Sequence, residues 1–282
     1  CIRDRLTHVP DSERHFAAPT DVSNQGSIDR WRVGVAGAWP DIIRGTDWDR
    51  PSWHYQLGAN LVIGNMTTPD PPGPLPGDAT LETQSLHIQQ AVELCTKVFS
   101  DSRHSKADRA IALCWLLHLY ADGHQPCHAG SLYAPAFPDG DRGANFIKLK
   151  DGSNLHAMWD GLLGYDASAN DVRRRVADMG NIKQEILREA RAGGNFEQWL
   201  SSETWLAESK QLARSKVYTD EVLGPIIAAS RGLTNGVPPL VLSKSYYRSA
   251  GTAARHRIKQ AGFRVAVVIH RGLLQARDAR SR

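Results

Sequence analysis

The sequence lacks several features that would identify a special class of protein. Its 282 residues include only four cysteines, Cys1, Cys95, Cys114 and Cys127, and none of them forms a Cys-x-x-Cys pair. This wide spacing excludes a zinc ribbon and a disulfide framework, and Cys95 and Cys114 fall in apolar helical patterns typical of a core. No apolar run approaches the roughly 18–20 residues that cross a bilayer, so we predict no membrane span.

The net charge of the chain is small, but positive charge is concentrated near its C-terminal end. The formal net charge is only +4, with 41% hydrophobic and 23% charged residues, which is ordinary globular composition. Residues 244–282, however, carry ten Lys and Arg against one acidic residue, Asp278. Two interpretations stay open: a solvated helix face, or a surface that attracts phosphate groups.

Strand signals are also few, whereas helical periodicity recurs along the chain. The pattern predicts helical segments over 79–101, 105–122, 153–164, 171–192, 196–217 and 242–278. The last is either one long helix or two helices broken near Gly262. Long loops are expected at 64–78, 129–145 and 219–241, and a small β-ribbon at 145–152. We predict an all-α fold and a single domain over residues 1–282.

The stretch "HLYADGHQPCHAG", residues 118–130, concentrates polar groups at the end of an apolar run. His118 and Asp122 are four residues apart and share one helix face, and His128 follows after the helix breaks at Pro126. The same four-residue spacing recurs at His156 and Asp160, while "AWPDIIR" and "SWHYQ" supply Asp41 and His54. An unsatisfied buried polar group costs roughly 2–7 kcal/mol, so this concentration needs an explanation.

Imidazole and carboxylate groups without thiolate suit zinc in a hydrolytic site. One His-x-x-x-Asp pair is weak evidence, because surface helices use it as an ordinary ion pair; two copies together with His128 favour a metal. His124 is expected beside the ligands rather than among them. The remaining histidines are interpreted as surface or core residues: His8, His15, His87, His104, His256 and His270.

At these residues the sequence resembles a known family. "WLLHLYADGHQPCH", "RGANFI" and "NLHAMWDGLL" resemble the signatures of the single-strand-specific zinc nucleases of the S1/P1 type, which share a fold with the zinc phospholipases C. "AWPDIIR" and "RPSWHY" resemble that family's upstream ligand segments, in the same order. The resemblance spans roughly residues 30 to 270. It implies a multi-helix bundle with long loops around a metal cluster.

The resemblance also implies a role for each site residue. Asp41, His54, His118 and Asp122 would bind one zinc, and Asp122 would also reach a third; a second zinc would be bound by His128, His156 and Asp160. Asp41 and Arg44 would be catalytic, with Arg44 contacting phosphate. Tyr55 would stack on a base, and Asn145 and Asn154 would orient ligands or substrate. A zinc-bound water or hydroxide would attack phosphorus.

The implied activity is hydrolysis of single-stranded DNA and RNA to 5′-phosphate products, with 3′-nucleotidase activity as a further expectation. The partners are then nucleic acid or nucleotides, with no stable protein partner. Members of the family are generally exported, so the resemblance implies a secreted or periplasmic protein. The visible residues do not themselves include a signal peptide.

Two departures from the family pattern affect these expectations. The family's third zinc is held by an N-terminal Trp and a nearby His, and neither has a counterpart around Cys1. We therefore expect that the natural protein begins upstream, and that three zincs bind the intact site but the third is weak or absent here. At position 57, where the family commonly has an acidic or amide side chain, this chain has Leu57.

Other interpretations remain open. A zinc phospholipase C-like phosphodiesterase is disfavoured by Asp160, because the pattern of those enzymes resembles His-x-x-x-Glu at this place. A metal-binding homologue without activity is favoured by Leu57 and by the missing N-terminal ligands. A purely structural protein, whose His and Asp groups are merely hydrogen-bonded, is the remaining alternative.

Overall fold

The fold of the chain is taken from a computed structural model, which describes residues 6–18, 22, 24–164 and 168–278. It is built mainly from helices, so the predicted all-α class is confirmed. The longer helices are α3 (Gln25–Ile42), α4 (Ile88–Ser100), α5 (Lys106–His124), α7 (Ala169–Asp178), α8 (Ile182–Ala192), α10 (Ser202–Leu212), α11 (Asp220–Ser230) and α12 (Lys244–Asp278). The shorter ones are α2 (Ser12–His15), α6 (Leu155–Asp160) and α9 (Phe196–Leu200), with helical turns η1 (Pro51–His54), η2 (Pro126–Ala129), η3 (Gly161–Leu163) and η4 (Ala213–Val217).

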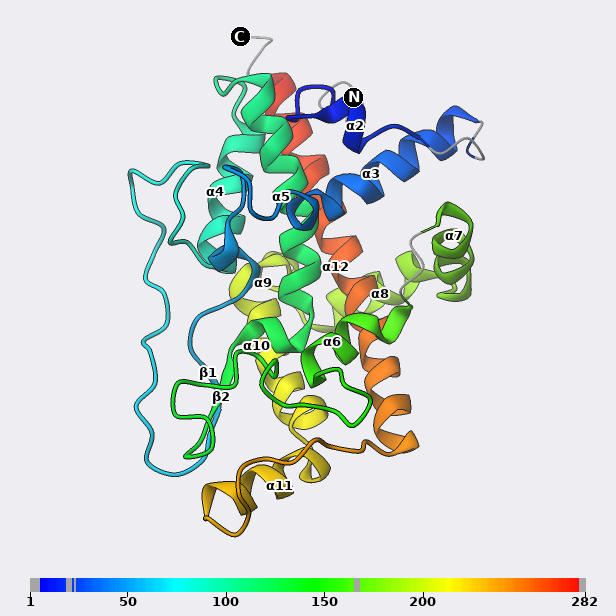
Figure 1. Cartoon of the computed structure of the whole chain (residues 1–282). Coiled ribbons are helices and arrows are strands. Elements are labelled where there is room, and N and C mark those ends of the chain that lie inside the picture. Colours follow the sequence, from blue (N-terminus) through cyan, green and yellow to red (C-terminus); the bar gives the residue numbers. More distant parts are fainter. Residues whose placement is uncertain (1–5, 19–21, 23, 165–167, 279–282) are drawn as a thin grey trace.

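Helix α5 is the central element of the molecule. It begins at Ser105, whose side chain accepts a hydrogen bond from the backbone N–H of Asp108, and it ends just before Pro126. Helices α3, α4 and α12 pack around it (Figure 1). Almost every side chain in its middle is buried, including Trp115, which explains its continuous apolar sequence. The polar residues at its C-terminal end therefore lie beside a large apolar core.

Helix α12 is one unbroken helix through Gly262, whose position is exposed. Some of its basic residues are exposed, as Arg248 and Arg255 are, and others pair with acidic side chains. Arg257 and Arg264 are buried against Glu208 of α10, and Lys259 and Arg271 pair with acidic residues of neighbouring helices. Neither α12 nor any other helix in the described part of the chain is both long and apolar enough to cross a membrane.

A second apolar cluster lies below the end of α5 and contains Leu132, Ile147, Leu155 and Trp159. Beside it, two short parallel strands pair, β1 (Ala59–Val62) and β2 (Ser131–Tyr133). The ribbon predicted at 145–152 is wrong: that segment makes only isolated bridges, from Lys148 to Asn154 and from Leu149 to Leu240. The observed strands are too short to show an alternating pattern in the sequence.

The predicted helix over 79–101 begins only at Ile88. In the residues before Ile88, backbone carbonyl groups accept hydrogen bonds from side chains of another segment. The buried Arg50 donates to the carbonyl of Leu81, and the indole of Trp53 donates to that of Thr83. A carbonyl used in this way is not free to build a helix.

Two further expectations are corrected. The loop expected at 219–241 contains α11, which buries Val222 and Ile226 one turn apart in spite of Pro225. The stretch 171–192 is divided into α7 and α8 around Gly180, whose φ of 72° ends the first helix. Local helical signals thus located the helices better than their ends.

The fold depends on the absence of a side chain at Gly123, near the end of α5. A Cβ there would lie 2.1 Å from Cζ3 of Trp205. We expect Gly123→Ala to lower the free energy of unfolding by about 3 kcal/mol, because overpacking a dense core forces side chains and backbone to shift. Urea unfolding checks this.

Gly262→Ala is the matched control, because nothing lies within 4 Å of a Cβ at that helical position. It should be neutral or stabilise by about 0.5–1 kcal/mol. Equal effects of the two substitutions would show that the contact with Trp205 is not restrictive.

Candidate metal centre

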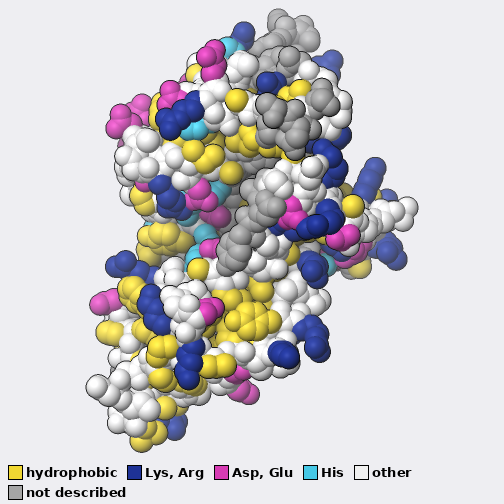
Figure 2. Space-filling view, turned by 45° about the vertical axis from the view of Figure 1, so that its right-hand side comes forward, with side chains coloured by type: hydrophobic (Ala, Val, Ile, Leu, Met, Phe, Trp, Pro, Cys, Tyr) yellow, Lys and Arg dark blue, Asp and Glu magenta, His cyan; other side chains and the backbone are white. Residues whose placement is uncertain are grey.

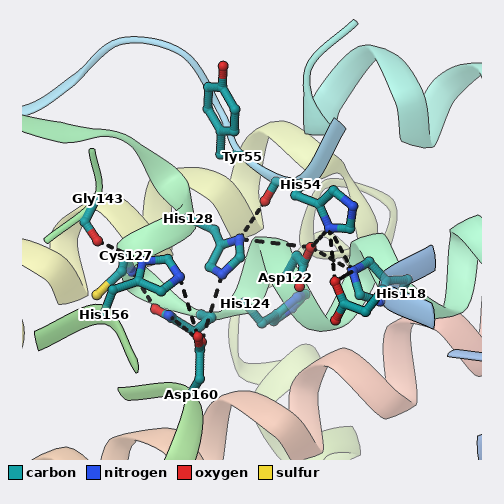
Figure 3. Close-up of polar contacts among 12 residues, drawn as sticks. His54, Tyr55, His118, Asp122, His124, Cys127, His128, Gly143, His156 and Asp160 are labelled. Atoms are coloured by element: carbon teal, nitrogen blue, oxygen red, sulfur yellow. Dashed lines mark hydrogen bonds and ion pairs between the residues drawn. The ribbon is translucent and has the colours of Figure 1, made fainter. Parts of the chain in front are cut away.

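Five segments, far apart in the sequence, place their His and Asp side chains at one site. Helix α3 contributes Asp41, η1 contributes His54, and η2 contributes His128. Helix α5 contributes His118 and Asp122, and α6 contributes His156 and Asp160. The structure therefore brings together all seven predicted ligands, of which Figure 3 labels all but Asp41. Six of them, all but His118, line a cavity of about 450 Å³. Figure 2 shows histidine and acidic side chains gathered in a hollow on this face.

The first group consists of Asp41, His54 and His118, joined by Asp122. Nδ1 of His54 and Nε2 of His118 are 2.8 Å apart, and each is 3.0 Å from Oδ2 of Asp122. Oδ1 of Asp41 lies 3.9 Å from His54 and 4.0 Å from His118. Four donor atoms thus face one another around a common centre.

The second group consists of His128, His156 and Asp160. Nε2 of His128 is 3.8 Å from Oδ1 of Asp160, and Nε2 of His156 is 3.4 Å from Oδ2. Asp122 joins this group to the first, because its Oδ2 is also 3.8 Å from Nδ1 of His128. Figure 3 shows Asp122 and His128 between the outer ligands of the two groups.

Backbone carbonyl groups fix three of the imidazole rings. Nδ1 of His118 donates to the carbonyl of Gly37 at 2.7 Å, Nδ1 of His156 donates to that of Gly143 at 2.7 Å, and Nδ1 of His128 donates to that of His54. Each bond leaves the Nε2 lone pair directed at the carboxylates. Metal-binding histidines are oriented in this way, since the second nitrogen donates to a carbonyl or carboxylate. His54 differs, because its Nδ1 faces the group and its buried Nε2 has no hydrogen-bond partner.

The electrostatics favour ionised carboxylates. Burial raises the pKa of Asp122, but the nearby imidazoles of His118 and His128 outweigh it and hold that pKa well below its usual range. Burial likewise lowers the pKa of His118, and Asp122 and Asp41 more than compensate, so the pKa is raised. Burial also lowers the pKa of His128, but Asp122 and Asp160 outweigh it and raise that pKa to about 9. Asp122 is therefore an anion at neutral pH, the form that binds a cation.

Comparison with known proteins identifies the family. The profile of the S1/P1 nuclease family matches residues 24–273. The chain belongs to the S1/P1 nuclease family. Among its relatives, "Endonuclease 4" of Arabidopsis thaliana is 27% identical over 166 residues, which are 57% of this chain and 50% of that protein. "Endonuclease 1" of the same plant is 28% identical over 175 residues, 61% of this chain and 52% of that protein. The match thus spans about half the length of these relatives.

Membership of the S1/P1 nuclease family implies a metal, and the residues present fit zinc. A tetrahedral zinc with bonds of about 2.0–2.1 Å to nitrogen or oxygen places its ligand atoms about 3.3 Å apart. The separations in the first group, 2.8 to 4.0 Å, bracket this value. The ligand atoms belong to imidazole and carboxylate groups, and the ring of His118 is oriented by the carbonyl of Gly37. Which atoms bind, and how many ions, stays a prediction.

The other residues expected in an S1/P1 nuclease site have distinct surroundings. Arg44 donates from Nε and Nη2 to Oδ1 of Asp41 and is half exposed at the cavity. The ring of Tyr55 is 43% exposed and stands over the site (Figure 3). Asn154 accepts from the N–H of Ala157 and so caps α6, whereas Asn145 donates to the carbonyl of Arg142. The two asparagines therefore orient backbone that carries or supports ligands.

Three contributions to the site could not be predicted from the motif. The side chain of Gln125 donates to Oδ1 of Asp160 at 2.9 Å and accepts from the N–H of Cys127, which links the two metal-facing segments. Ser209 donates to the carbonyl of Gly123, and Arg257 donates to that of His124. These bonds satisfy the carbonyl groups at the end of α5. His124, expected beside the ligands, lines the same cavity, donates to the carbonyl of Tyr120 and contacts Arg264.

The carbonyl of Gly143, which holds His156, belongs to a left-handed turn. Arg142, Gly143 and Ala144 have φ values of 53°, 59° and 69°. Glycine is required in the middle, because a Cβ at Gly143 would lie 2.2 Å from the carbonyl oxygen of Cys127. The buried Asp141 anchors this turn by accepting from the N–H of Leu132 and the hydroxyl of Tyr218.

Substitution of Asp122 should remove more metal than any other single change, because this carboxylate reaches both groups. We expect Asp122→Ala to lose the zinc of the first group, and the exposed Asp70→Ala to keep the wild-type content. Elemental analysis after dialysis against zinc measures ions per chain. Full zinc content in Asp122→Ala would contradict the assignment.

Asp141 should make stability depend on pH. Burial raises its pKa from 3.8 to about 6, so the folded state holds this proton more tightly than the unfolded chain does. Its contribution to stability is complete below the unfolded value and is lost as the pH rises through about 6. Relative to Asp141→Asn, the wild type should lose on the order of 3 kcal/mol of unfolding free energy across this window.

Urea unfolding at a series of pH values tests this expectation. The difference in unfolding free energy between the wild type and Asp141→Asn should change between about pH 3.8 and 6 and be constant outside this range. For the exposed Asp70→Asn, unfolding free energy plotted against pH should run parallel to that of the wild type. Parallel curves for all three proteins would show that Asp141 does not titrate differently on folding.

Proposed function

We propose that this protein is a zinc-dependent endonuclease that hydrolyses phosphodiester bonds in single-stranded DNA and RNA and leaves 5′-phosphates. The observation that carries the proposal is the pair of His/Asp groups, joined through Asp122 and open to one cavity, in a chain of the S1/P1 nuclease family. The names of its relatives as endonucleases support the same reaction.

When bound, zinc would lower the pKa of a coordinated water towards about 7 and neutralise charge that develops on the phosphate. The protein's own residues prepare this chemistry. Asp122 and Asp160, fixed by histidines and by Gln125, present carboxylate oxygens to cations. The guanidinium of Arg44 lies at the cavity beside Asp41, where its planar donors suit a phosphate oxygen.

The preference for single strands rests on Tyr55. Tyr55 follows the ligand His54 in the chain, and its exposed ring lies edge-on to that of His87, so an unpaired base can stack on it. Stacking contributes about 1–3 kcal/mol per base and does not depend on the sequence. A base within a duplex is already stacked on its neighbours and would have to be taken out of the helix first.

A binding protein without activity is the alternative that one observation favours. Leu57 lines the cavity on the Tyr55 side of the metal centre, where the family commonly has a polar side chain. An apolar group there cannot accept a hydrogen bond from a base or from the attacking water. Zinc binding without cleavage would be the signature of this alternative.

Cleavage of circular single-stranded DNA tests the proposal directly. We expect the zinc-loaded protein to linearise and degrade it and to leave duplex plasmid largely intact. EDTA should stop the reaction and added zinc should restore it. Asp122→Ala should lower the rate by at least about 100-fold, which corresponds to about 2.7 kcal/mol. The products should be ligated without prior phosphorylation, because they carry 5′-phosphates.

Three results would contradict the proposal in different ways. Zinc binding with intact DNA and RNA would support the inactive homologue. Release of diacylglycerol from phosphatidylcholine, without cleavage of DNA, would support the phospholipase alternative. Cleavage that persists in EDTA would exclude zinc as the required cofactor. A cell fractionation of the native host tests export, which the family resemblance implies and which belongs to the same proposal.

A further inference from the structure

The segment from Arg142 to Lys150 has a feature that the metal centre does not use. After the left-handed turn, exposed and buried side chains alternate: Phe146, Lys148 and Lys150 are exposed, while Ile147 and Leu149 are buried in the second core cluster. This alternation places one aromatic ring and two lysines on the solvent side of a segment whose other side is fixed. The segment runs below the end of α5 (Figure 1).

Phe146 is 46% exposed, so its ring is accessible to a ligand. The guanidinium of Arg142 lies 5.1 Å from its ring centroid. An exposed aromatic ring beside a guanidinium offers two flat surfaces on which a base can stack. Nζ of Lys148 approaches the carbonyl of Asn145 at 3.4 Å, so a second cation lies on the same part of the segment.

Arg142, against which Phe146 lies, borders the metal centre. Arg142 and Asn145 line a cavity of about 580 Å³, and the ligands His54, His128 and His156 line it too. Tyr55 belongs to the same cavity. A strand whose base stacks on Tyr55 and whose phosphate meets the metal groups would therefore pass into a space bounded by Arg142.

The backbone at Arg142 is held in a costly conformation. A left-handed conformation costs a non-glycine residue roughly 1–2 kcal/mol, and both Arg142 and Ala144 adopt it. The side chain of Asn145 donates to the carbonyl of Arg142, and the buried Asp141 fixes the preceding position. Local strain maintained in this way is found at binding sites, where it fixes the direction of a side chain.

We propose that Arg142, Phe146 and Lys148 form a second binding position for single-stranded nucleic acid, which holds the nucleotide next to the one at the metal centre. This inference rests on the proposed nuclease function. Phe146 and Arg142 supply stacking, and Lys148 supplies charge to a phosphate. The residues from 142 to 150 include three cations and no carboxylate, which suits a polyanion. Asp139, exposed at the same cavity, limits how far the phosphates extend on that side.

Phe146→Ala tests stacking. For a single-stranded oligonucleotide KM should rise about tenfold, the equivalent of about 1.4 kcal/mol, with little change in kcat. For bis(p-nitrophenyl) phosphate, a small phosphodiester with no nucleoside, both constants should equal those of the wild type. Leu233→Ala, at an exposed leucine of the segment after α11, is the matched control and should leave both substrates unaffected.

Arg142→Gln and Lys148→Gln test the charges. The affinity for a labelled phosphorothioate strand, measured by fluorescence anisotropy, should depend less steeply on salt in each variant. The slope of log K against log salt should fall by about 0.7 for each phosphate that the variant no longer neutralises. Arg191→Gln, at an exposed arginine of α8, should keep the wild-type slope.

The outcomes separate this inference from the proposed function. If the wild type cleaves both substrates and Phe146→Ala has an unchanged KM for the oligonucleotide, the second position is wrong and the nuclease proposal stands. If Phe146→Ala impairs both substrates equally, Phe146 supports the metal centre rather than a nucleotide, and the inference is again wrong. If the wild type cleaves neither substrate, the proposed function itself fails.

Discussion

The carboxylate of Asp122 is the group on which the arrangement of the site depends. It lies 3.0 Å from imidazole nitrogens of His54 and His118 and 3.8 Å from that of His128, so it joins segments separated by more than sixty residues. An ionised carboxylate with only 14% of its side chain exposed needs nearby cations or hydrogen-bond donors to stabilise it. Backbone carbonyls of α3 and η1 hold His118 and His128 in turn, and the carbonyl of Gly143 holds His156 of the second group. The position of each ligand therefore depends on the other ligands and on the backbone around them.

Much of this could be predicted from the sequence because the strongest signals were local. The spacing of His118 with Asp122, and of His156 with Asp160, follows from the helical repeat, and both pairs lie on helices as expected. The helix predicted over 105–122 agrees within two residues with α5, which the structure shows to be capped by Ser105 and to end before Pro126. Family motifs then connected Asp41 and His54 to these helices, which no periodic pattern could have done.

The rest depended on contacts between distant segments. Gln125 resembles a turn residue in the sequence, and only the position of α6 turns its amide towards Asp160. The chain before Ile88 has helical periodicity, yet Arg50 and Trp53 take its carbonyl groups. Helix α11 has Gly224 and Pro225 in its middle, so its sequence resembles a loop. The burial of Val222 and Ile226 stabilises it as a helix. Tertiary hydrogen bonds and packing override local preference at each of these places.

The pair of hydrogen bonds at the end of α5 has a consequence for how the protein reaches its active form. Ser209 and Arg257 hold the carbonyls of Gly123 and His124, and Arg257 is separated from His124 by 133 residues in the sequence. Contacts of such long range form late, because a large loop must close first. The last helix carries none of the seven predicted ligands, yet its Arg257 satisfies a carbonyl at the end of the helix that bears two of them. The carbonyl of His124 therefore lacks this partner until α12 has docked.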